Sequence, residues 1–397
     1  CKVRHYGSDN ALPSALAVAG IFKDYQRGAL YVRAALLSEA RKPIEILDDV
    51  EVIEPRPGEV RVAVKYCGLC HSDLGFVTGK SPLMGPMVPG HEAAGIVESV
   101  GIGVAHLAPG DPVILTPAPP CGQCYYCQRN EHSLCVNAMG ILSGTLTDGT
   151  TGLSWRGQPI MRGCGVGALA EYVTLPATGA IRIDDGIPLD VACVIGCALQ
   201  TGVGAVLNTA AVEPGATCVV MGLGGIGMAT VQGARIAGAS VIIGSDPVPE
   251  RRDKALGFGA THVVDPTDED IGALVLEATS GIGADYVFEA AGKTELIEQG
   301  IQLSRMGGTT VMVGSPGFEE NLTVPNVVLM QALEKKLCGC LLGSSNSLFE
   351  IPRLLRLWRQ GLLDMESMVT ARRPLSEVNE GFADLEASVG IRTVIEI

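Results

Sequence analysis

The sequence predicts a β-rich first domain and an α/β domain, with a doubly wound parallel sheet, inserted before the chain returns to the first domain. Two observations lead to this expectation. In the first half of the chain, short apolar runs are separated by Gly- and Pro-rich turns, a pattern typical of a barrel-like β domain. Beyond Thr201, apolar runs alternate with helical patterns, which indicates a parallel sheet covered by helices on both faces.

The chain of 397 residues is long enough for two domains with substantial cores. We expect an N-terminal extension at 1–30, the first domain at 31–198, the α/β domain at 199–341, and a C-terminal return to the first domain at 342–397. The expected strands of the first domain are 31–36, 44–47, 59–66 and 95–101, with a last strand at 391–397. Those of the α/β domain are 219–221, 241–243, 262–264, 284–289 and 308–314, and expected helices are 250–258, 294–303 and 349–359.

Composition excludes several classes of partner. The formal net charge of −14 opposes binding to nucleic acid or to an anionic membrane. No apolar run approaches the ~20 residues that a membrane-spanning helix needs. Residues 11–20 loosely imitate a signal peptide, but Asp9 and Pro13 interrupt the pattern, and we expect a reducing cytoplasm.

A glycine-rich turn predicts a dinucleotide site. Gly222, Gly224 and Gly227 form a G-x-G-x-x-G pattern between an apolar strand and a helix, and Asp246 follows about 20 residues later, as the fingerprint requires. The helix N-terminus would face the pyrophosphate. An acid at Asp246 favours NAD over NADP, although Arg251 and Arg252 soften that preference, and Asp246 could instead cap the next helix. The predicted cofactor residues here are Gly222, Leu223, Gly224, Gly225, Ile226, Gly227, Asp246 and Arg251.

The thirteen cysteines do not suggest a disulfide framework, because such frameworks belong to short secreted chains. Four of them, Cys121, Cys124, Cys127 and Cys135, lie close together, and we define 117–137 as the cysteine lobe. Four thiolates can close a tetrahedral shell, which is typical of structural zinc. An iron–sulfur cluster is the minor alternative, and a nucleic-acid-binding ribbon would space its cysteine pairs more widely.

A second candidate metal set is dispersed. Cys70, His91 and Cys197 would give two thiolates and one imidazole with an open fourth position, as in catalytic zinc sites, and Glu92 adjoins His91. Taken singly, His91 fits a satisfied buried histidine, and the cysteines fit small apolar residues. The spacing of these residues in the sequence does not show whether they lie together in the folded protein.

Together these motifs resemble the zinc-dependent medium-chain alcohol dehydrogenases, particularly the liver-type branch. The resemblance covers about 31–397 and rests on four motifs in the family's order: Gly90 to Gly95, the four lobe cysteines, Gly196-Cys197 and Gly222 to Gly227. It implies a GroES-like catalytic domain with an inserted Rossmann domain, and NAD in the cleft between them. It also implies a homodimer acting on a small alcohol or aldehyde.

The resemblance further implies roles for individual residues. Cys70, His91 and Cys197 would hold catalytic zinc, which Glu92 could bind transiently, and Asp73 would support His91. Zinc would act as a Lewis acid on the alcohol, Ser72 would relay its proton, and the hydride would pass to NAD. His71 and Arg392 would contact the pyrophosphate, Thr201 would lie near the nicotinamide, and Val313 would offer its backbone to the carboxamide.

Several positions depart from the family pattern. Gly75 stands where a relay histidine often occurs, so we expect the proton to leave through water or another group. Met139 replaces the arginine of the glutathione-dependent formaldehyde branch, which disfavours that thiol-adduct substrate. A sibling thiol-adduct dehydrogenase and a non-catalytic relative remain the alternatives. A wide pocket for bulky alcohols is expected from Gly163 and Cys164, which replace bulky channel residues, and from Pro117 and Ser81.

Overall fold

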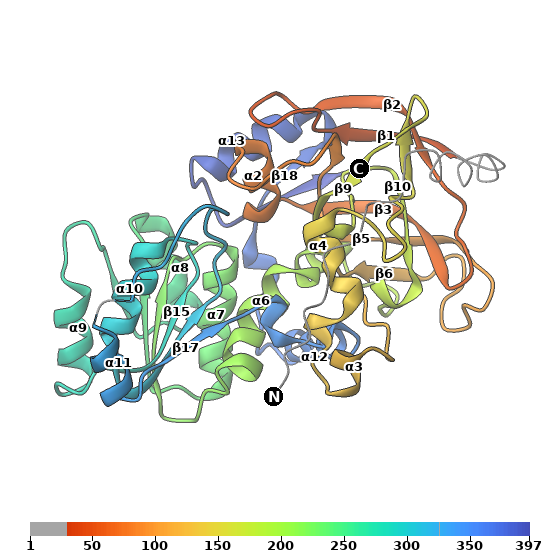
Figure 1. Ribbon diagram of the computed structural model, residues 1–397. Helices are drawn as coiled ribbons and strands as arrows, with labels where there is room; N and C mark the ends of the chain where they lie inside the picture. The colour runs from red at the N-terminus through yellow and green to blue at the C-terminus, as the bar shows by residue number, and fades with distance from the viewer. Residues whose placement is uncertain (1–29, 325) are drawn as a thin grey trace, which may run out of the picture.

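The computed structural model describes residues 30–324 and 326–397, which form two domains side by side (Figure 1). The predicted N-terminal extension lies outside the described residues, except Leu30, which begins the first strand. In the described ranges, no single helix has the length and apolar character needed to cross a bilayer. One bent pair, Leu189–Gly196 with Ala198–Thr209, passes that test by length and composition only.

The first domain is built from mostly antiparallel sheets. A seven-stranded sheet has the order β11-β6-β5-β3-β19-β18, with β10 also paired to β3, beside a four-stranded sheet β1-β2-β7-β8 and a β4-β9 pair. The strands are β1 (Leu30–Leu36), β2 (Glu45–Val52), β3 (Glu59–Gly68), β4 (Met87–Val88), β5 (Glu92–Val100), β6 (Pro112–Leu115), β7 (Leu153–Trp155), β8 (Gln158–Pro159), β9 (Met161–Arg162), β10 (Tyr172–Pro176), β11 (Ala180–Arg182), β18 (Val369–Pro374) and β19 (Arg392–Glu396). The helices are α2 (His71–Thr78), α3 (Tyr125–Gln128), α4 (Gly140–Ser143), α5 (Leu189–Ala192), α12 (Ser347–Arg359) and α13 (Val378–Glu386).

The second domain contains one six-stranded parallel sheet in the order β14-β13-β12-β15-β16-β17. Its strands are β12 (Thr217–Met221), β13 (Val241–Ser245), β14 (His262–Val264), β15 (Ala284–Glu289), β16 (Ser304–Met312) and β17 (Lys336–Gly339). Its helices are α6 (Ala198–Gly204), α7 (Gly225–Ala237), α8 (Pro249–Phe258), α9 (Ile271–Ala278), α10 (Thr294–Leu303) and α11 (Val327–Ala332).

Neighbouring residues of β12 point to opposite faces of this sheet. Val220 packs in the same cluster as residues of α7 and α8, whereas Val219 packs with residues of α9. The sheet is therefore buried on both sides, as the continuous apolar runs predicted. The strand order reverses between β12 and β15, and ligands of such sheets bind at the carboxyl ends of the strands at this point.

Most predicted elements are confirmed, with differences at their ends. The strand 284–289 and the helix 294–303 have the predicted limits. β2 continues to Val52, past the acidic residues that interrupt its apolar pattern, because it pairs with both β1 and β7. β16 ends at Met312, since the amides of Val313 and Gly314 both donate to the carbonyl of Glu289.

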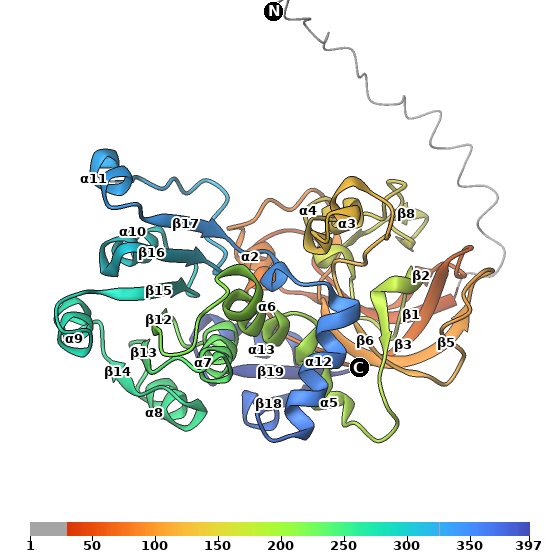
Figure 2. The same ribbon diagram turned by 90° about the horizontal axis from the view of Figure 1, so that it is seen from below.

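The predicted return of the chain to the first domain is confirmed. β19 pairs antiparallel with β3, with Ile395 opposite Cys67. Figure 2 shows β19 and α13 in the middle of the molecule, where α6 enters the parallel-sheet domain. One hydrophobic cluster contains residues of both domains, including Ile114, Leu199, Phe288 and Val394. The two domains thus share a hydrophobic core.

Candidate active site and metal centres

The structure brings the dispersed metal set together. Potential ligand atoms of Cys70, His91, Glu92 and Cys197 all lie within 4.8 Å of one another, and all four residues are buried. Cys70 lies immediately before α2, Glu92 begins β5 with His91 immediately before it, and Cys197 lies immediately before α6. The pairing of β3 with β5 and the shared core bring these segments to one place.

Asp73 fixes the orientation of His91. Its Oδ2 lies 2.9 Å from Nδ1 of His91, and its Oδ1 accepts a 2.8 Å hydrogen bond from the amide of Gly90. Burial lowers the pKa of His91, but the Asp73 carboxylate and nearby thiols outweigh burial and hold that pKa well above its ordinary value. With Nδ1 beside Asp73, Nε2 is the nitrogen left for a metal.

The two thiols titrate as a coupled pair. A hydrogen bond from the Cys197 thiol lowers the pKa of Cys70 well below its ordinary value, and the same contact raises the pKa of Cys197. One thiolate is therefore favoured without any cation. A bound divalent cation would favour deprotonation of the second thiol.

Glu92 is a buried carboxylate with little compensation. Neither of its oxygens has a hydrogen-bond partner among the described residues, and the nearest opposite charge, Nη2 of Arg392, lies 3.5 Å from Oε1. Burial raises the pKa of Glu92 to about 8, although Arg392 opposes that shift. A Cβ added to Gly68 would lie 2.6 Å from Oε2, so glycine leaves room for this side chain. The donor set of two thiols, one imidazole and an orphaned carboxylate fits zinc.

Small apolar side chains surround this centre. Cys70 and Cys197 share a cluster with Ala118, Ala138 and Leu342. The hydroxyl of Ser72 lies 3.8 Å from Sγ of Cys70. Such surroundings would limit water near a bound alcohol and leave Ser72 as the polar group beside it.

The predicted substrate-channel positions behave differently from one another. The expectation that Gly163 opens the channel is wrong, because an added Cβ would lie 2.6 Å from Cα of Pro89, and glycine is required by close backbone packing. Cys164 is buried, and a ligand atom of each of Cys164, Asp73 and His91 lies within 4.8 Å of the others. This contact with the metal centre was not predicted, and no local motif signals it.

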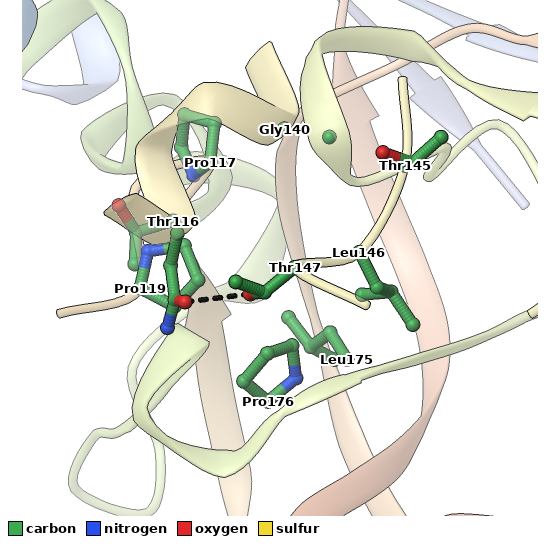
Figure 3. A pocket seen from close by; sticks show the side chains of 11 residues that line it. Thr116, Pro117, Pro119, Gly140, Thr145, Leu146, Thr147, Leu175 and Pro176 are labelled. Carbon is green, nitrogen blue, oxygen red and sulfur yellow. Dashed lines mark hydrogen bonds between the residues drawn. The ribbon is translucent and has the colours of Figure 1, made fainter. Parts of the chain in front are cut away.

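Pro117 and Ser81, the other two residues expected near the substrate channel, lie in different parts of the first domain. Pro117 lines a small pocket with Thr116, Pro119 and Leu175 (Figure 3), and no candidate zinc ligand lines that pocket. Ser81 lies against Gly75, where its amide donates to the Gly75 carbonyl at 2.9 Å. A Cβ added to Gly75 would lie 2.8 Å from Oγ of Ser81, so that hydroxyl occupies the space where a relay side chain would begin.

The cysteine lobe forms the second candidate metal centre. Ligand atoms of Cys121, Cys124, Cys127 and Cys135 lie within 4.8 Å of one another. The amide of Cys121 lies 3.2 Å from Sγ of Cys135, and the amide of Cys124 lies 3.3 Å from Sγ of Cys121. Backbone amides lower the pKa of Cys124 to about 6. Four sulfurs supplied with such donors fit a closed tetrahedral zinc shell.

The glycine turn lies between β12 and α7. Gly222 has φ 93°, and a Cβ there would lie 2.8 Å from the amide nitrogen of Ala291. A Cβ on Gly224 would meet no atom within 4 Å, so this turn borders open space. A Cβ on Gly225 would collide with the guanidinium of Arg392, which lies over the start of α7. An open turn with a cation beside it fits a pyrophosphate.

Asp246 lies at the end of β13, beside the glycine turn. Its Oδ2 accepts a hydrogen bond from the amide of Leu223, and its Oδ1 accepts one from the amide of Val248, at 2.8 and 2.9 Å. Arg251 lies 3.8 Å from Asp246, and its guanidinium donates to the carbonyls of Ser388 and Gly390. Arg251 thus also ties this domain to the C-terminal segment.

The remaining predicted cofactor residues lie on several elements of the two domains. His71 is exposed at the first position of α2, and Gly227 is in the first turn of α7 with Ile226. Thr201, in α6, has a buried hydroxyl with no partner in the described part of the chain. Val313 follows β16 and is buried. The structure therefore places the catalytic set, the glycine turn and these residues around one interdomain region.

The fold and its two candidate metal centres indicate a zinc-binding oxidoreductase with a GroES-like domain and a Rossmann-like domain. Family models agree: residues 56–185 match the alcohol dehydrogenase GroES-like domain, and residues 225–357 match the zinc-binding dehydrogenase domain. The chain belongs to the zinc-type medium-chain alcohol dehydrogenases.

Relatives cover nearly the whole chain. Alcohol dehydrogenase B of Mycobacterium tuberculosis is 36% identical over 91% of this chain and 97% of its own. An NDMA-dependent alcohol dehydrogenase of Amycolatopsis methanolica is 38% identical over 91% of this chain and 98% of its own. The solved benzyl alcohol dehydrogenase of Acinetobacter calcoaceticus has 28% identity and a TM-score of 0.86, covering 93% of this chain and 99% of that one.

Proposed function

We propose that this chain is an NAD-dependent zinc alcohol dehydrogenase of the reducing cytoplasm. It oxidises alcohols with bulky apolar groups to aldehydes or ketones, catalyses the reverse reaction, and works as a homodimer. The observation that carries this proposal is the buried set of Cys70, His91 and Cys197 with Glu92, whose oxygens have no hydrogen-bond partner among the described residues. A non-catalytic relative would have no need to retain such a costly cluster.

The preference for NAD rests on Asp246. A carboxylate at this position accepts hydrogen bonds from a ribose and repels a 2′-phosphate. The two arginines that could soften this preference both lie against Asp246: Nη1 of Arg251 is 3.8 Å from its Oδ2, and Arg252 donates to its backbone carbonyl at 2.7 Å. Each also has other partners. Arg251 donates to two carbonyls of the C-terminal segment, and Arg252 lies 2.8 Å from Asp265.

Zinc held by Cys70, His91 and Cys197 would supply Lewis acidity that favours the alkoxide, and bound NAD would accept its hydride. Asp73 orients His91, and the apolar cluster around Cys70 limits water. The Ser72 hydroxyl would take the alcohol proton. With Ser81 in the space beside Gly75, that proton would leave Ser72 through water.

The preference for bulky alcohols rests on two supports. Ala118 and Ala138, both small, pack beside the metal-ligand thiols together with Leu342 and the partly buried Ile141. A structural relative at 28% identity is a benzyl alcohol dehydrogenase. The thiol-adduct alternative has less support, because Met139 replaces the expected arginine and is exposed.

A panel of alcohols and acceptors tests the proposal. With NAD, we expect kcat/KM for benzyl alcohol to exceed that for ethanol about tenfold or more, because the added apolar area is buried beside the metal. NADP should be poorer by about 10²-fold, because its phosphate meets Asp246. The measurement is the change in absorbance of the nicotinamide band. Because Gly75 replaces a relay histidine, the alkaline limb of the pH profile should show no pKa typical of such a histidine.

Other results of that panel would contradict the proposal. If the protein oxidises alcohols with NDMA but not with added NAD, then NAD is not the external acceptor. NDMA is included in the panel because one relative is an NDMA-dependent alcohol dehydrogenase. Turnover only of formaldehyde with glutathione would support the thiol-adduct alternative. No turnover in any arm, with zinc present, would support the non-catalytic relative.

The homodimer is proposed from an exposed apolar helix beside an open sheet edge. None of the residues of α11 is buried, and Val328 is 71% exposed. The neighbouring strand β17 is the last strand of the parallel sheet. A second copy offers the same edge and the same helix, so one two-fold contact could cover both.

Sedimentation velocity should therefore show a dimer at micromolar concentration. Val328→Asp should shift the protein toward monomer, because a charge on the contact is costly to bury. Leu276→Asp, a matched change at an exposed leucine of α9, should leave the dimer intact. A wild-type monomer, or equal effects of the two changes, would contradict the proposal.

A further inference from the structure

Glu289 is a buried carboxylate at the cofactor end of the parallel sheet. It is the last residue of β15, where it lies opposite Met221 of β12 and Met312 of β16. These positions are the carboxyl ends of the three strands beside the point where the strand order reverses. Its side chain is fully buried, so it cannot itself touch a ligand in the cleft.

Two turns are held by this one residue. Its Oε1 accepts hydrogen bonds from the amides of Ala291 and Lys293, at 2.8 and 3.2 Å. Its backbone carbonyl accepts hydrogen bonds from the amides of Val313 and Gly314, both at 2.8 Å. The turn after β15 and the turn after β16 are therefore both fixed to Glu289.

These turns also pack against each other and against the glycine turn. A Cβ on Gly314 would lie 2.8 Å from Oε2 of Glu289, and a Cβ on Gly292 would lie 2.6 Å from the carbonyl oxygen of Ser315. A Cβ on Gly222 would lie 2.8 Å from the nitrogen of Ala291. Ala291 and Ser315 are exposed, so the outer face of this contact borders solvent.

The second carboxylate oxygen of Glu289 lowers the stability of the fold. Oε2 is buried and has no hydrogen-bond partner in the described ranges, and burial raises the pKa of Glu289 above its ordinary value. An unpaired buried oxygen destabilises a fold, and the two hydrogen bonds that Oε1 accepts offset part of that cost. What an apolar residue could not do is hold the amides of Ala291 and Lys293.

We propose that Glu289 is a positioning residue for the nicotinamide half of the cofactor. Its carboxylate fixes the turn at Ala291, and its backbone carbonyl fixes the turn at Gly314. Together these turns set the backbone groups that this half of the cofactor would contact. The inference rests on the proposed use of NAD. It adds a residue that the glycine fingerprint does not contain and that acts through its neighbours.

NADH binding followed by fluorescence, on the zinc-loaded protein, tests this inference. Glu289→Ala should raise Kd for NADH about tenfold or more, because the turn after β15 loses the side-chain acceptor of two of its amides. Glu289→Gln should stay within about threefold of wild type, since its amide oxygen can accept the same two hydrogen bonds. KM for NAD should rise in the alanine variant while KM for the alcohol and the zinc content stay unchanged.

Asp285→Ala is the matched control. Asp285 is at the other end of β15, and its carboxylate also accepts a backbone amide, that of Thr217, at 2.8 Å. This variant should lose comparable stability and keep its affinity for NADH. If Glu289→Ala does not fold, Glu289→Asp replaces it, because its shorter side chain cannot hold the same turn.

The outcomes separate the two proposals. If wild type binds NADH and Glu289→Ala binds equally well, the role of Glu289 is overturned and the proposed function stands. Equal losses in Glu289→Ala and Asp285→Ala would show a structural effect only and also overturn it. If the wild-type protein does not bind NADH, the proposed function fails together with this inference.

Discussion

Replacing Cys70 with serine should lower kcat for alcohol oxidation by about 10³-fold or more, because a zinc Lewis acid is worth several kcal/mol of transition-state stabilisation. Cys70 is the ligand whose thiolate is favoured before any metal binds, since the Cys197 thiol and His91 lower its pKa. A serine hydroxyl at this position stays protonated and binds zinc poorly. Steady-state kinetics and metal analysis of the purified variant measure both effects.

Cys193→Ser provides the control for this change. Cys193 is equally buried, precedes Cys197 by one helical turn, and donates its thiol to the carbonyl of Asp190 at 3.4 Å. It is not among the clustered ligand atoms of the described residues. This variant should keep its zinc and most of its activity. Full zinc content and activity in Cys70→Ser would exclude the assigned centre.

The sequence predicts best those features whose chemistry is local. The four lobe cysteines lie within one short segment, and the glycine turn lies between a strand and a helix, so spacing alone indicates each site. The dispersed ligands are different. Nothing in the local sequence connects Cys70 with Cys197, and only the family resemblance joined them before the structure did.

Other features depend on packing that no sequence pattern records. Gly163 was expected to widen a channel, but its missing Cβ makes room for the backbone of Pro89. Cys164 contacts the metal centre because of a backbone turn with φ 46°, which sequence patterns give no reason to expect at cysteine. In the sequence, Glu289 is only a polar residue at the end of a predicted strand. Its proposed positioning role can be inferred only from the amides that surround it in the structure.

Metal loss from the cysteine lobe should destabilise the protein as a whole. The lobe has little apolar core of its own: Tyr125 is 67% exposed and Met139, just beyond it, is 58% exposed, whereas Cys127 and Cys135 are buried. When cysteines occupy the interior of a small segment, metal coordination supplies the stability that a hydrophobic core would otherwise give. Without metal, four thiols would remain with few apolar neighbours.

Cys124→Ser should therefore lower Tm by about 5 °C or more and open the lobe to proteases, because structural zinc contributes directly to folding. The same loss should occur in wild type as the pH falls. In the metal-free lobe the folded-state pKa of Cys124 is depressed to about 6, so the stability that its thiolate contributes there is present above the ordinary thiol pKa and lost as the pH falls through about 6; bound zinc would move this loss to lower pH. Differential scanning fluorimetry with zinc analysis across this range measures both.

Cys338→Ser separates loss of a metal ligand from loss of a thiol. Cys338 is a partly exposed free cysteine in β17, outside both metal centres, so its replacement should change neither Tm nor zinc content. Protease cleavage within 117–137 should appear in Cys124→Ser and be absent in Cys338→Ser. Because the lobe ligands are separate from the catalytic ones, Cys124→Ser should retain activity at low temperature and lose it on warming. Immediate inactivation without a fall in Tm would instead place this zinc in catalysis.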